Sequence, residues 1–476
     1  MLEAWAGLSV SVLSIATVLA LGTRASLAAG LALRTLGWVG LVLIVHGCGW
    51  RAHAPRRLAA AVAAGVVGLL AAAVVVPPIE SGDVWSYAMY GRIVAVHHAS
   101  PYRHLPDEYP GDPFLARMDA VYHHTPSRYG PLFAAVAGGV AGVARGSALA
   151  TRLLFQALAA LAALACAAVV WRKTSSLVAV ALVGLNPFTV VAVANGGHND
   201  VLVGLALLGA VLVADRRPAL AGSLLGAAVL VKATAVLALA GLAAWLLHRR
   251  RRAVAARCAG AGALVVLVGS AVAGGSATLT PLRQARLEVS KASVWHWLHR
   301  AAGGEISAVA GAVALVAGAL LVLRALRERE PAGAGTAPLV AYLLLGAYVL
   351  PWYVFWVLPA LIATGLRRLA VFFVALAALF QLAELPGPRH AAEPVWLHRL
   401  QNGALYGAVP VVEAGAALVL LIAAGAGLKG RASSRLEPST VEQAVLGQRT
   451  DLVSGRAETL GQEGECAQRR APRARV

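Results

Sequence analysis

The stretch LAAAVAAGVVGLLAAAVVVP (58–77) carries no charged residue and has the length of a bilayer-spanning helix, which needs about 20 apolar residues. Similar runs recur along the 476-residue chain, which is 59% hydrophobic and only 13% charged. Its mean hydropathy is +0.72. The repeated runs predict an all-α polytopic membrane protein that lies in a lipid bilayer.

The formal net charge of +19 comes largely from Arg residues in short links between the apolar runs. Examples are WRK (171–173), DRR (215–217) and HRRRR (248–252). Cytoplasmic links of membrane proteins retain positive charge, so topology accounts for the basic residues. We therefore predict no nucleic-acid partner.

Alternating these links across a membrane predicts 13 or 14 transmembrane helices with both termini in the cytoplasm. The chain then divides into a membrane domain (1–428), with a large outer loop at 78–147, and a polar tail (429–476) expected to be disordered cytoplasmic chain. Two apolar runs, 218–231 and 233–247, are short for a full crossing and join at Lys232.

The outer loop begins with GDVWSYAMYGR (82–92), where Asp83 lies just past the end of the 58–77 run. A partly desolvated carboxylate there can act as a base on a group that arrives from outside the cell. The neighbouring Tyr87 and Arg92 are candidate substrate contacts. In the alternative interpretation Asp83 only caps the next helix, with Ser81 as a rival cap.

Further candidate substrate contacts follow along the chain. Two arginines of the loop can each bind a phosphate or carboxylate in bidentate fashion, or can pair with a loop acid. A polar turn follows the span that ends near residue 195, and Lys232 is the one charge in a long apolar stretch, where it either meets a phosphate or extends to the interface. These candidates are Arg103, Arg128, Tyr129, His198, Asn199, Asp200 and Lys232.

The spacing of His and Cys residues offers no metal-ligand pattern, since adjacent His pairs such as 97–98 and 123–124 are not by themselves a metal site. The sequence also has no glycine-rich phosphate loop. We predict no metal site and no cofactor, and leave a metal requirement open.

Five segments together resemble, in the same order, the actinobacterial polyprenol-phosphate-mannose-dependent α-1,6-mannosyltransferases, which build lipomannan and related lipoglycans. The segments are GDVWSYAMYGRIVAVHHASPY (82–102), DPFLARMDAVYHHTPSRYGPLF (112–133), NPFTVVAVANGGHNDVLVG (186–204), LLGAAVLVKATAVL (224–237) and PWYVFWVLP (351–359).

This resemblance implies a GT-C glycosyltransferase fold whose first outer loop carries the catalytic Asp, which falls on Asp83. It also implies a polyprenyl-phosphate-mannose donor, a mannan or glycolipid acceptor, and an active site on the outer face of the cell membrane. Inversion at the sugar carbon would give an α-1,6 linkage. Two alternatives are a GT-C enzyme using another lipid-linked sugar such as arabinose, and a multispan transporter or lipid flippase.

Overall fold

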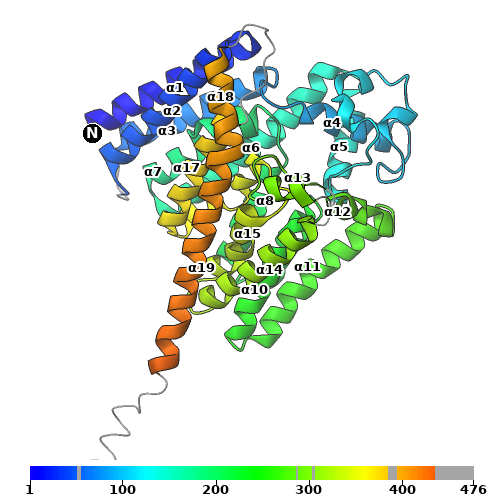
Figure 1. The fold of residues 1–476 in the computed structure, drawn as a ribbon. Helices are drawn as coiled ribbons and strands as arrows, with labels where there is room; N and C mark the ends of the chain where they lie inside the picture. Colours follow the sequence, from blue (N-terminus) through cyan, green and yellow to red (C-terminus); the bar gives the residue numbers. More distant parts are fainter. Residues whose placement is uncertain (51–54, 286–287, 303–305, 384–393, 435–476) are drawn as a thin grey trace, which may run out of the picture. The chain divides into compact units, whose positions relative to one another are not determined.

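The computed structural model describes residues 1–50, 55–285, 288–302, 306–383 and 394–434 (Figure 1). The chain divides into a large compact unit, Met1–Ile422, and a second unit, Ala423–Val476, of which only the end of the last helix is described. Most of the predicted tail (429–476) therefore lies outside the described residues.

All regular elements of the described residues are helices. Those of the first half are α1 (Leu2–Leu21), α2 (Leu27–Cys48), α3 (Arg56–Val75), α4 (Asp83–Ala95), α5 (Pro131–Ala144), α6 (Ala148–Thr174), α7 (Leu177–Gly184), the π-helix η5 (Phe188–Ala194), α8 (Asp200–Val213) and α9 (Pro218–Val229). Those of the second half are α10 (Val236–His248), α11 (Arg252–Val272), α12 (Thr280–Ala285), α13 (His296–Ala302), α14 (Ile306–Ala325), α15 (Ala332–Leu345), α16 (Leu358–Ala363), α17 (Arg367–Ala383), α18 (Val395–Gly403) and α19 (Val409–Ser434).

Eight helical segments within the described residues are long and apolar enough to cross a membrane. This confirms the prediction of an all-α polytopic membrane protein. Six further apolar helices have 10 to 17 residues, among them α9 and α5. The predicted count of 13 or 14 crossings depends on these short helices and stays a prediction.

Two buried amides hold the end of α3 against α6 and against the end of η5. The side-chain nitrogen of Asn195 donates to the carbonyls of Ala73 and Val76 at the end of α3, at 3.0 and 2.9 Å. The side-chain nitrogen of Gln156 in α6 donates to the same two carbonyls and to that of Asn195. Because α3 has no partners of its own for its last carbonyls, these amides satisfy them. The contacts bring the segment after α3 beside the turn after η5.

The outer loop is folded onto α4 by a buried carboxylate. Asp112 accepts from Nε of Arg92 and pairs with Nε2 of His97, both at 2.8 Å, and also accepts from the backbone of Phe114. Burial alone raises a carboxyl pKa, but these partners outweigh it and lower the pKa of Asp112. Figure 1 shows α4 and α5 side by side with the loop that joins them.

Candidate active site

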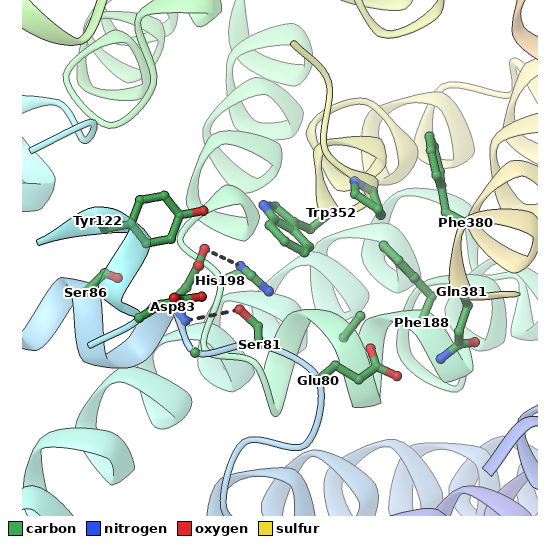
Figure 2. Close-up of a pocket in the computed structure, with 14 residues that line it drawn as sticks. Glu80, Ser81, Asp83, Ser86, Tyr122, Phe188, His198, Trp352, Phe380 and Gln381 are labelled. Atoms are coloured by element: carbon green, nitrogen blue, oxygen red, sulfur yellow. Dashed lines mark hydrogen bonds and ion pairs between the residues drawn. The ribbon is translucent and has the colours of Figure 1, made fainter. Parts of the chain in front are cut away.

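Asp83 is the first residue of α4, and its carboxylate turns away from the helix end. The hydroxyl of Ser81 accepts the hydrogen bond from the Asp83 backbone amide, at 3.1 Å. The Asp83 side chain makes no capping bond and lies 3.5 Å from Nδ1 of His198 (Figure 2). The interpretation of Asp83 as a helix cap is therefore wrong, and its rival Ser81 takes the capping role.

The turn between η5 and α8 brings His198 against Asp83. His198 is almost fully buried, and its ring stacks on Trp352 with 3.8 Å between the ring centres. The hydroxyl of Tyr87, one turn along α4, lies 3.5 Å from Oδ2 of Asp83, the same oxygen that faces His198. Burial raises the pKa of Tyr87 well above its ordinary range, so its hydroxyl stays a donor.

Lys232 lies at the break between α9 and α10, in an extended conformation that ends the helix. Its ammonium is 3.5 Å from the carboxylate of Asp200, which is fully buried and accepts from the indole of Trp356 at 2.8 Å. The rings of Tyr129 and Tyr353 lie about the same ammonium, at 5.4 and 4.9 Å. The ammonium of Lys232 therefore lies inside the protein at the predicted break, where a charge needs such partners.

Asp83 is ionised at neutral pH. Burial alone raises its carboxyl pKa, but the contact with His198 and the positive charge of Lys232 outweigh that effect and hold the pKa below its ordinary value of 3.8. One-fifth of the side chain stays exposed. The carboxylate is thus open to a ligand and unprotonated.

Asp83 lies where two cavities meet. The first, called here the polar cavity, has a volume of about 310 Å³. It is lined by Glu80, Ser81, Gly82, Asp83, Ser86, Asp119, Tyr122, Phe188, Ala192, His198, Pro351, Trp352, Phe380 and Gln381 (Figure 2).

The second, called the apolar cavity, has a volume of about 360 Å³ and shares Asp83, Ser86, Tyr122 and Trp352 with the first. Lys232, Arg128 and several tyrosines line its polar end. The rest of its wall is mostly apolar and comes from the end of α9, the last turns of α11 and the segment 278–282, with residues such as Leu230, Val266, Leu279 and Leu282. Leu279 and Leu282 are about half exposed, so this wall reaches the protein surface.

Some predicted contacts lie elsewhere. Arg92 is engaged by Asp112, and Arg103 is exposed; neither lines the two cavities. Asn199 is buried beside them, with no hydrogen-bond partner for its amide among the described residues. Arg128 does line the apolar cavity, where it forms a bidentate pair with Glu288 at 2.6 Å.

Several lining residues were missed in the sequence. Glu288 and Trp352 come from segments far from the outer loop, and Gln381 belongs to α17, which reads as an ordinary span. Trp352 was quoted within PWYVFWVLP, yet no local pattern shows that it faces Asp83. Within the described residues, no group of three or more His, Cys, Asp or Glu could hold a metal ion.

The fold and site define a polytopic helical membrane protein with an ionised carboxylate and the largely buried ammonium of Lys232 beside an apolar cavity. A family model described as "Alpha-(1->6)-mannopyranosyltransferase, N-terminal domain" matches residues 3–249, more than half of the chain, and the protein belongs to this family. No curated protein and no solved structure gives a significant match. The chain is therefore a membrane glycosyltransferase of the mannosyltransferase class, which requires a sugar donor and an acceptor, and this membership favours the transferase over the transporter alternative.

Proposed function

We propose that the protein moves mannose from polyprenyl-phosphate-mannose to an α-mannoside acceptor, forms an α-1,6 linkage with inversion, and acts in cell-envelope lipoglycan synthesis with a GT-C fold. The observation that carries the proposal is the position of Asp83 between two cavities. One is the polar cavity, and the other is the apolar cavity, whose wall includes the cationic side chains of Lys232 and Arg128. A lipid phosphate needs both an apolar wall and a positive charge, and the apolar cavity supplies them.

The reaction follows from this arrangement. The acceptor hydroxyl attacks C1 of mannose on the face opposite the phosphate, and its proton passes to the Asp83 carboxylate. The bond between C1 and the phosphate oxygen breaks, and polyprenyl phosphate leaves with both bonding electrons. In a transition state of oxocarbenium character, the attacking hydroxyl becomes acidic as its bond to C1 forms, so a carboxylate of low pKa suffices as the base.

Lys232 is the cation that stabilises the leaving phosphate in this proposal. A preorganised positive charge in a site that excludes water stabilises developing negative charge most strongly. Arg128 is the second candidate, but its guanidinium is already neutralised by Glu288. For Arg128 to bind the phosphate, Glu288 must give up part of this pair.

Donor choice tests the proposed function. We expect the purified protein to transfer labelled mannose from polyprenyl-phosphate-mannose to a synthetic α-mannoside and to leave GDP-mannose unused, because only the lipid donor fits the apolar wall. Transfer from GDP-mannose at a similar rate would contradict the proposal.

The outer-face assignment makes a separate prediction. In a background without native cysteines, Ala116→Cys in the outer loop should react with an impermeant maleimide on intact cells, whereas Arg172→Cys in the last turn of α6 should react only after the membrane is opened. Both positions are exposed, so access depends on the side of the membrane alone. Labelling of Arg172→Cys but not Ala116→Cys on intact cells would reverse the topology.

A further inference from the structure

The polar cavity has a wall that the reaction described above does not use. Opposite Asp83 it is formed by Glu80, in the segment before α4, and by Gln381 of α17 (Figure 2). These side chains come from segments 300 residues apart in the sequence and meet only in the folded protein. Glu80 is paired with Arg34 of α2 at 2.6 Å, which fixes its carboxylate in place.

Gln381 presents an unused hydrogen-bond donor to this cavity. The indole of Trp38 in α2 donates to the side-chain oxygen of Gln381 at 3.0 Å. Because an indole nitrogen can only donate, this bond identifies the oxygen and leaves the amide nitrogen as the free end. That nitrogen is buried, in a residue only 5% exposed, and has no hydrogen-bond partner among the described residues.

Ser86 adds a second unused group from the side of α4. Its hydroxyl is buried in a residue 3% exposed and also lacks a partner within the described part of the chain. Leaving buried polar groups without partners is costly, so two such groups on the wall of one cavity indicate a ligand that hydrogen-bonds to them. A fixed carboxylate and an amide donor together match a ligand with several hydroxyl groups.

Trp352 lines both cavities, so its indole adds an aromatic surface where they meet. One face of its ring is covered by His198, with the two rings nearly parallel at 16°. A broad aromatic surface beside a few placed polar groups is the usual make-up of a small-molecule site, and pockets of this kind begin at about 300 Å³. The cavity volume of about 310 Å³ therefore suits a terminal sugar ring better than a long chain.

We infer that the polar cavity is the acceptor subsite, in which Gln381 and Glu80 bind hydroxyls of the terminal acceptor sugar and the sugar's apolar face lies on Trp352. This inference rests on the proposed function and deepens it, because it assigns the acceptor to the side of Asp83 opposite the lipid donor. Gln381 is then a specificity-determining residue.

The test is Gln381→Met, measured with α-1,6-linked mannobiose as acceptor. Loss of one hydrogen bond to the sugar should raise the acceptor KM about tenfold and leave the donor KM unchanged. Binding of mannobiose without donor, followed by tryptophan fluorescence, should weaken by a similar factor. The matched control is Trp38→Phe, which removes the Trp38–Gln381 bond but keeps the amide nitrogen, and it should change the acceptor KM much less.

If Gln381→Met fails to fold, Ser86→Ala serves as the second variant, since it removes a hydroxyl that has no hydrogen-bond partner among the described residues and should fold normally. Because Ser86 lines both cavities, both constants are measured, and the acceptor KM should rise more than the donor KM. An unchanged acceptor KM in the folded variants, or an equal effect of Trp38→Phe, overturns the acceptor subsite. Absence of any mannose transfer by the wild-type protein overturns the proposed function instead, so the two failures are distinguishable.

Discussion

Asp83→Asn is expected to lower the rate of mannose transfer by a factor of about 10² to 10⁴, the usual contribution of a general base. Asn keeps the size of the side chain and can still contact His198, but it cannot take the proton of the acceptor hydroxyl. The backbone N–H of residue 83 still donates to the hydroxyl of Ser81, so the start of α4 should remain intact. Rates are to be compared at saturating donor and acceptor, so that the loss appears in kcat.

Asp107→Asn is the matched control, because Asp107 belongs to the same loop, lines neither cavity and pairs with His124 at the surface. It should transfer mannose at nearly the wild-type rate. Asp119 would be a poor control, since it lines the polar cavity. Near wild-type transfer by Asp83→Asn would show that another group accepts the proton.

Lys232→Met is expected to lower kcat by a factor of about 10² to 10³, the typical loss when one preorganised stabilising group is removed. Lys232→Arg should retain part of the activity, since it keeps the charge. The single Met variant leaves Asp200 buried without its cation, and breaking such a pair destabilises a protein by about 3–5 kcal/mol.

The double variant Lys232→Met/Asp200→Asn separates catalysis from stability. It removes both charges, so its thermal unfolding in detergent should lie closer to wild type than that of the single variant, while its transfer rate stays low. Lys291→Met is the control, because Lys291 is exposed and lines neither cavity. Full activity of the stable double variant at limiting donor would mean that Lys232 only anchors the helix break.

Local sequence properties were sufficient to predict the class of fold and the break at Lys232. Apolar length identifies the helices directly, and an isolated charge in an apolar stretch must find a partner. Asp83 and His198 were separate predictions, each placed shortly after a predicted span, and no local pattern pairs them. Their 3.5 Å contact depends on the buried amides of Gln156 and Asn195, which have no distinctive local signal.

The second wall of the polar cavity could not be predicted. Gln381 lies in α17 among Ala, Leu and Phe, where a single amide is as easily a helix-packing residue. Arg92, predicted to contact substrate, pairs with Asp112 in the structure and lines neither cavity, which its position in the sequence did not indicate. The roles of Gln381 and Arg92 depend on tertiary contacts, and no local sequence pattern indicates those contacts.

The central claim is that the protein transfers mannose from a lipid-linked donor to an α-mannoside with inversion, and that Asp83, between the two cavities, is the base. It is tested most directly by NMR of the product that the purified protein forms from a β-linked polyprenyl-phosphate-mannose and α-1,6-mannobiose. The account predicts a trisaccharide whose new linkage is α-1,6, together with one polyprenyl phosphate released for each mannose transferred. A β-linked product, or no trisaccharide from a folded protein, would contradict it.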